Sequence, residues 1–143
     1  MSMNAIPWWV FALLSALFAA LTTIFAKLGM QDISSTLGTA VRTVVVLVLA
    51  WLIVFGKQEA GQMATFTTHT WLMLILSGVA TGLSWLAYFR ALQIGPTAFV
   101  AAVDKSSIIL IMILAALFLG EPLTWRGVLG IGLIAVGTLV LIR

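Results

Sequence analysis

Five long apolar runs, separated by shorter polar, glycine- or proline-containing segments, constrain the fold of this chain more than any other feature. Each run is about 20 residues long, the length that an α-helix needs to cross the hydrocarbon core of a bilayer. The predicted helices cover residues 7–27, 35–55, 71–92, 97–119 and 124–142. We therefore expect an all-α membrane protein that forms a single transmembrane domain over residues 1–143 and contacts the lipid bilayer.

The segments between the runs support these boundaries. Gly95-Pro96 separates the third run from the fourth, and Gly120-Glu121-Pro122 separates the fourth from the fifth. Because proline is tolerated in the first turn of a helix, each segment is typical of one helix ending and the next beginning. The long polar stretch over residues 57–70 is too polar to span and holds the single histidine, His69, which we interpret as a solvated interfacial residue.

The composition excludes several classes of function. Apolar residues make up 63% of the 143 residues, beside only seven Lys or Arg and four Asp or Glu, too few for a water-soluble surface. The basic residues are scattered, so no patch for nucleic acid is predicted. The absence of cysteine excludes disulfides and thiolate metal sites, and we expect no metal or other cofactor. No Ser/His/Asp grouping or phosphate-binding glycine loop is present, so enzymatic activity is not expected.

The positions of the charged residues predict how the chain inserts. No Lys or Arg precedes Pro7, so the first run is interpreted as a retained span of an inner-membrane protein rather than a signal peptide. Five spans place the termini on opposite faces. With the N-terminus outside, the inner basic residues are Lys27, Arg90 and Arg143, joined by Arg42 if its side chain extends toward the first turn, and the outer ones are Lys57 and Arg126. This weak bias is compatible with insertion in both orientations and with a plain N-out topology.

Two charged residues lie deep in the fourth predicted helix. Asp104 and Lys105 are roughly 11 Å from its start at 1.5 Å per residue, too far for an aspartate to reach the interface. Adjacent residues do not face one another on a helix, so we expect the two side chains to point to different neighbours. Arg42, Arg90 and Tyr88 are the candidate donors to Asp104. The carboxylate belongs either to a substrate or proton site or to a buried pair that fixes helix packing.

Small and polar residues recur at helical spacing on three of the predicted helices, where they form faces that do not suit lipid. These faces are expected to converge on a transport pathway, although close helix packing explains them equally well. The predicted pathway residues are Thr22, Thr81, Ser84, Trp85, Tyr88, Asp104 and Ser107. The predicted charge-balancing residues are Arg42, Arg90 and Lys105, of which the two arginines are alternatively interfacial anchors.

Glycines aligned on the third and fifth helices favour close helix–helix contact, within one chain or between two copies. The predicted packing or dimer residues are Gly78, Gly82, Gly127, Gly130 and Gly137.

Several motifs, in this order and spacing, resemble the EamA-type domain of the drug/metabolite transporter superfamily. They are Tyr88-Phe89-Arg90-Ala91-Leu92, Gly95-Pro96, Val103-Asp104-Lys105-Ser106-Ser107, Phe118-Leu119-Gly120-Glu121-Pro122-Leu123 and Gly130-Ile131-Gly132-Leu133-Ile134-Ala135-Val136-Gly137. Phe25-Ala26-Lys27-Leu28-Gly29 and Arg42 match the same domain more loosely.

This resemblance implies a secondary transporter that exports a small organic metabolite or drug by alternating access. Familiar members carry two inverted five-helix repeats, whereas this chain carries one, half of an inverted-repeat transporter fold. Because such transporters bind substrate where the halves meet, the resemblance implies a dimer, and we expect an antiparallel homodimer. The related small multidrug resistance proteins pair in this way and carry a glutamate in their first helix, where this chain has Thr22 and Thr23 but no carboxylate.

Two alternatives remain open at the level of sequence. A non-transporting membrane subunit would use the same small-residue faces to stabilise a larger complex. A passive channel would use the same polar faces without alternating access.

Overall fold

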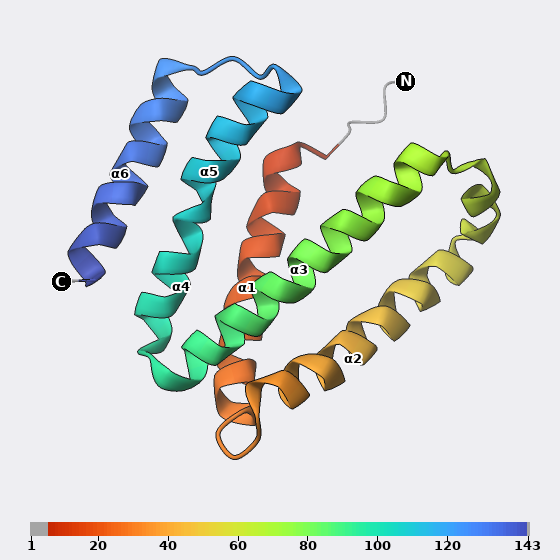
Figure 1. Cartoon of the computed structure of the whole chain (residues 1–143), viewed down its shortest axis with the longest axis horizontal. Helices are drawn as coiled ribbons and strands as arrows, with labels where there is room; N and C mark the ends of the chain where they lie inside the picture. The colour runs from red at the N-terminus through yellow and green to blue at the C-terminus, as the bar shows by residue number, and fades with distance from the viewer. Residues whose placement is uncertain (1–5, 143) are drawn as a thin grey trace. The chain divides into compact units, whose positions relative to one another are not determined.

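The computed structural model describes residues 6–142, which form helices and connecting turns with no β-strand among them. The elements are α1 (Trp8–Gly29), α2 (Ser35–Gly56), η1 (Ala60–Thr65), α3 (Thr68–Ile94), α4 (Thr97–Lys105), α5 (Ser107–Leu114), η2 (Ala115–Leu119) and α6 (Trp125–Ile142) (Figure 1). Five helical segments are long and apolar enough to cross a membrane, with Thr97–Leu119 as the fourth. The predicted all-α membrane fold is therefore confirmed.

The helix starts follow from side-chain caps. Ser34 precedes α2, and its hydroxyl accepts a hydrogen bond from the Leu37 N–H at 3.1 Å. Thr67 does the same for α3, where its hydroxyl accepts from the Thr70 N–H at 3.1 Å. Such caps satisfy N–H groups that have no partner inside the helix. The cap at Thr67 explains why α3 begins three residues before the predicted start at residue 71.

The chain forms two compact units, which are described separately below. The central unit comprises Ile24–Gln93, from the last turns of α1 to the end of α3. The terminal unit comprises the described residues up to Thr23 together with those from Ile94 onward. Helix α1 thus contributes residues to both units.

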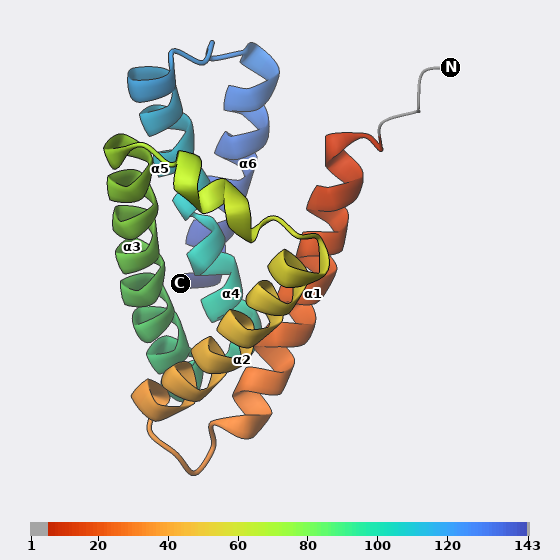
Figure 2. The same cartoon turned by 90° about the vertical axis from the view of Figure 1, so that its right-hand side faces the viewer.

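The core of the central unit lies where α1 ends, α2 begins and α3 ends. Its buried apolar side chains are Ala26, Met30, Phe89 and Leu92. Gly38 on α2 allows a close approach here, because a Cβ at this position would lie 3.0 Å from both Cγ and Cε of Met30. Figure 2 shows the short loop that returns the chain from α1 to α2 at this corner.

Two polar side chains tie the ends of α1 and α3 together. Lys27 Nζ donates hydrogen bonds to the carbonyl oxygens of Leu92 at 2.5 Å and Gln93 at 3.3 Å. In return, Gln93 Nε2 donates to the carbonyl oxygens of Met30 at 2.8 Å and Ile33 at 2.7 Å. The last carbonyls of a helix have no partner within it, so each of these two helices caps the other. We call this arrangement the reciprocal cap.

In the terminal unit, α4, α5 and η2 make up one interrupted span, and α6 packs beside it (Figure 1). The span ends at Gly120, whose φ of +67° lies in the left-handed region that glycine adopts without strain. Its N–H donates to the Ala115 carbonyl, closing the wide π-type turn of η2. The chain then enters α6, on which Thr138 is a buried polar residue.

We predict that Gln93→Leu lowers the thermal stability of the purified protein in detergent. The substitution keeps most of the side-chain volume but removes both donors to the Met30 and Ile33 carbonyls. At about 0.5–1.5 kcal/mol for each hydrogen bond, the free energy of unfolding should fall by about 1–3 kcal/mol.

Gln62→Leu is the matched control, because Gln62 lies exposed in η1 and no side-chain hydrogen bond ties it to another helix. Unfolding can be followed by circular dichroism or by tryptophan fluorescence. Equal midpoints for Gln93→Leu and Gln62→Leu would show that the reciprocal cap does not stabilise the fold.

Candidate functional site

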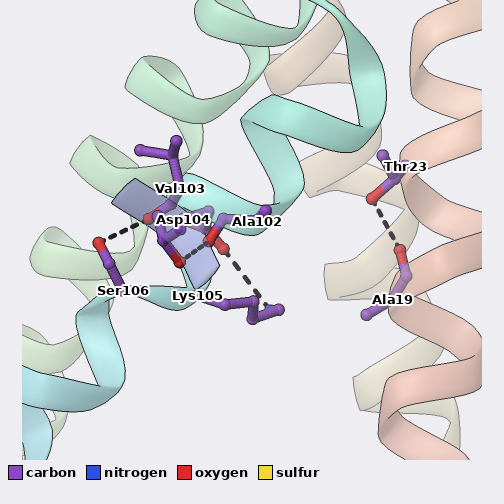
Figure 3. A network of polar contacts seen from close by, with 8 residues as sticks. Ala19, Thr23, Ala102, Val103, Asp104, Lys105 and Ser106 are labelled. Carbon is purple, nitrogen blue, oxygen red and sulfur yellow. Dashed lines mark hydrogen bonds and ion pairs between the residues drawn. The ribbon is translucent and has the colours of Figure 1, made fainter. Parts of the chain in front are cut away.

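The fourth span is interrupted at Ser106, although the sequence pattern predicts one continuous helix over residues 97–119. In a regular α-helix the Ser106 N–H would donate to the Ala102 carbonyl, but here it donates to the Val103 carbonyl at 3.0 Å. The Ser106 hydroxyl donates to the same Val103 oxygen at 2.6 Å (Figure 3). A serine side chain that competes for backbone acceptors in this way disrupts a helix without any proline.

Helix α6 contributes a hydroxyl to this break. The Ala102 carbonyl, which lacks its usual helical donor, lies 3.4 Å from Thr138 Oγ1. The same hydroxyl lies 2.9 Å from the Ile134 carbonyl of its own helix. Thr138 is only 7% exposed, so this polar contact is inside the terminal unit. The break in one helix is thus matched by a polar residue on its neighbour.

Asp104 and Lys105 lie in the last turn of α4, directly before the break. Their side chains form an ion pair, with 3.6 Å between Asp104 Oδ2 and Lys105 Nζ (Figure 3). The prediction that they point to different neighbours is therefore wrong for the single chain. Lys105 is the final residue of α4, and its long stem turns back to the carboxylate. The Asp104 side chain is 38% exposed and that of Lys105 is 69% exposed, so neither is buried within the single chain.

Two other predicted pathway residues belong to the terminal unit. Ser107 is the exposed first residue of α5 and follows the break directly. Thr22 is half-buried on α1, where its neighbour Thr23 donates its hydroxyl to the Ala19 carbonyl at 2.9 Å. Asp104, Lys105 and Ser107 are therefore brought together around one helix interruption.

The predicted residues on α3 belong to the central unit. Thr81 and Ser84 are exposed, and the Thr81 hydroxyl donates to the Ser77 carbonyl at 2.9 Å. Trp85 and Tyr88 are half-buried beside Phe89, with ring centroids 6.4 and 5.3 Å from the Phe89 ring. The polar face of α3 thus passes into an aromatic group at its C-terminal end.

Arg42 from α2 lies against this aromatic group. Its guanidinium carbon lies 4.2 Å from the centroid of the Phe89 ring, a cation–π contact. Its Nε is buried and has no hydrogen-bond partner among the described residues. Arg90, in contrast, lies exposed on α3 and donates to Gln93 Oε1 at 3.3 Å. The two arginines that the sequence treats alike therefore have different surroundings.

A cavity of about 170 Å³ opens beside this group, inside the central unit. Phe89 and Leu92 form part of its apolar wall, and its polar lining comes from Lys27, Gln31 and Gln93. No carboxylate side chain lines it. The cavity is thus lined mainly by apolar side chains, and two of its three polar ones, Lys27 and Gln93, already take part in the reciprocal cap.

The sequence pattern did not single out as site or packing residues several that the structure places there, namely Phe89, Gln93, Gly38, Ser106 and Thr138. Phe89 contacts Arg42 and lines the cavity, and Gln93 forms half of the reciprocal cap. Phe89 lies three residues before Leu92 and four before Gln93, the spacing of one helix face, which is the signal that groups them. Nothing in the sequence distinguishes Gly38 from the other glycines.

The glycines that the sequence singled out have open surroundings. A Cβ on Gly78, Gly82, Gly130 or Gly137 would meet no atom of its own unit within 4 Å. At Gly127 the atom nearby is Thr124 Oγ1 at 3.1 Å, within the first turn of α6. Their role in helix packing therefore stays a prediction for contacts with a second chain.

The comparisons with known proteins agree with each other. The model of the EamA-like transporter family matches residues 6–143. A protein of Sinorhizobium sp. named "Uncharacterized transporter in cobO 3'region" is 49% identical over 134 residues, which cover 94% of this chain and 95% of that protein. No solved structure gives a significant match. Both matches point to membrane transport rather than catalysis.

We predict that Thr138→Val destabilises the terminal unit, because the nearly isosteric change removes the donor beside the Ala102 carbonyl. The single hydroxyl proton is shared between the Ala102 carbonyl at 3.4 Å and the Ile134 carbonyl at 2.9 Å, so its loss should lower the free energy of unfolding by about 0.5–1.5 kcal/mol. Thr43→Val is the control, since the Thr43 hydroxyl bonds only to the Thr39 carbonyl of its own helix. The same small loss in both variants would show that Thr138 does not support the break.

Proposed function

The chain belongs to the EamA-like transporter family, and on this premise we propose that it is a secondary transporter that exports a small organic metabolite or drug by alternating access. It is a multi-pass membrane protein, and we place it in the inner cell membrane. Alternating access exposes one site to each side of the membrane in turn.

The observation that carries the proposal is the interruption of the fourth span beside Asp104. Charged residues within membrane spans are costly and usually serve a substrate or ion pathway. Transporters often place such residues where a spanning helix is discontinuous, because the broken backbone leaves groups that a ligand can contact. Asp104 combines a carboxylate, a paired cation and partial exposure at such a break. We assign Asp104 the coupling role, in which its carboxylate binds and releases a proton. Lys105 is the neighbouring cation that stabilises the charged carboxylate.

We further propose that the working unit is an antiparallel homodimer. The Sinorhizobium relative, of which 95% is covered, is also too short for two five-helix repeats. A single repeat needs a second one to enclose a pathway. The open faces at Gly78, Gly82, Gly130 and Gly137 are suited to close contact with a second copy. The nearly balanced basic residues allow both orientations to insert.

We predict that Asp104→Asn abolishes gradient-driven uptake into membrane vesicles. The amide is similar in shape but can neither bind a proton nor balance Lys105 at neutral pH. Everted vesicles containing the wild-type protein are first tested with labelled organic acids, amino acids, nucleosides and cationic dyes. For each compound that they accumulate, Asp104→Asn should reduce uptake to the level of vesicles without the protein.

Glu121→Gln is the matched control, because this carboxylate lies exposed in the loop before α6 and should leave uptake unchanged. Asp104→Glu should restore part of the activity. Normal uptake by Asp104→Asn would contradict the coupling role, and no accumulation of any compound by the wild type would contradict the proposed transport of these classes.

We also predict that the chain inserts in both orientations. Separate C-terminal fusions to a reporter active only in the cytoplasm and to one active only outside should both give signal. Adding two lysines next to Lys57 should shift the ratio of the signals, because basic residues are retained on the cytoplasmic side. Signal from one reporter alone would contradict the antiparallel homodimer and would favour an oppositely oriented partner or the role of a docking subunit.

A further inference from the structure

The tryptophans are distributed unevenly between the ends of the spans. Successive spans cross the membrane in opposite directions, so the starts of the first, third and fifth spans lie at the same membrane face as the end of the second. Five of the six tryptophans belong to these ends. They lie in the first four residues of a helix or five residues before the end of α2, and we call them the tryptophan anchor: Trp8, Trp9, Trp51, Trp71 and Trp125.

All five residues of the anchor are exposed. Trp8 is 81% exposed, Trp125 is 73% exposed, and Trp51, the least exposed of the five, is still 38% exposed. An indole ring combines a large apolar surface with one N–H donor, and the boundary between lipid headgroups and acyl chains suits both parts. At 1.5 Å per residue, each Cα lies within about 8 Å of the end of its helix, which is close to that boundary.

Two rings of the anchor pack against phenylalanines at the same face. The ring centroids of Trp51 and Phe55 are 5.4 Å apart, and those of Phe66 and Trp71 are 5.5 Å apart. Phe66 directly follows η1, in the polar segment that leads from α2 to α3. Its contact with Trp71 therefore holds this segment close to the start of α3.

The opposite ends of the spans carry no comparable set of amphipathic rings. The sixth tryptophan, Trp85, lies nine residues before the end of α3, and the single tyrosine, Tyr88, is half-buried beside Phe89. Membrane proteins typically carry tryptophan and tyrosine at both membrane–water interfaces. One copy of this chain therefore supplies only one of the two aromatic belts.

We propose that the tryptophan anchor binds the headgroup–acyl boundary of one leaflet, and that an oppositely inserted second copy provides the same anchor in the other leaflet. The partner is lipid, because the five rings are spread over the ends of four helices, whereas a helix–helix contact uses one face of a helix. Lys57 pairs with Glu59 at this face, and Glu121 and Arg126 also carry opposite charges, so the anchor needs no anionic lipid. This inference rests on the proposed antiparallel homodimer and adds the surface that holds each copy at its depth.

The experiment measures the tryptophan fluorescence of the purified full-length protein in phosphatidylcholine vesicles. The lipid carries bromine atoms either close to the glycerol or near the middle of the bilayer, and bromine quenches the rings that lie close to it. We expect the shallow bromines to quench the fluorescence more strongly than the deep ones, because five of the six emitting rings belong to the anchor.

Two matched variants assign the signal to the anchor. Trp125→Phe should reduce the fluorescence that is lost to shallow bromines, whereas Trp85→Phe, which removes the ring within the span, should not. Equal or stronger quenching by the deep bromines would overturn the proposal. Weak quenching by both lipids would also overturn it, because the rings would then be covered by protein.

The second anchor is tested in intact cells. The chain has no cysteine, so Gln62→Cys marks the face of the anchor and Asp32→Cys marks the loop between α1 and α2 at the opposite face. A maleimide that does not cross the inner membrane should label part of each variant, and the remainder should react only after permeabilisation. Labelling of one variant alone would overturn the anchor in the second leaflet. A failure of the quenching test leaves the labelling and Asp104 uptake tests unaffected, so the anchor and the proposed function can fail separately.

Discussion

The cost of leaving a backbone carbonyl unbonded within a membrane underlies most of the polar chemistry of this protein. Lipid supplies no hydrogen-bond donors, so each helix end or interruption near the hydrocarbon core needs a donor from the protein. The reciprocal cap of Lys27 and Gln93 meets this need at the ends of α1 and α3. Thr138 lies beside the Ala102 carbonyl at the break in the fourth span. In both places a polar residue in an apolar helix has a backbone partner.

Charged side chains within the spans have two different environments. Asp104 and Lys105 pair with each other beside a helix break, where both remain accessible. Arg42 instead lies over the ring of Phe89, with its guanidinium carbon 4.2 Å from the ring centroid. The first arrangement balances two opposite charges within one turn, and the second sets a cation against the face of an aromatic ring.

Much of the architecture is predictable from the sequence, because a span of about 20 apolar residues has essentially one hydrogen-bonded form in lipid. The five helices and the Gly120 turn follow from this rule and from turn chemistry. The break at Ser106 does not, since a serine within a helix often bonds back without disrupting it. The pairing of Asp104 with Lys105 was also missed, because the rule that neighbours diverge concerns the directions of the Cβ atoms, and the long lysine stem can turn back to the carboxylate.

The sequence by itself determined the class of protein, the number of spans and the residues that carry charge into the membrane. These properties depend on composition and local spacing, because an apolar run of about 20 residues must form a helix to satisfy its backbone hydrogen bonds in lipid. Only the tertiary structure decided which of these residues have partners, that Arg42 lies over the ring of Phe89, and that Gly38 is the glycine at a close helix contact. Those outcomes depend on which helix faces meet, and residues distant in the sequence meet only after packing.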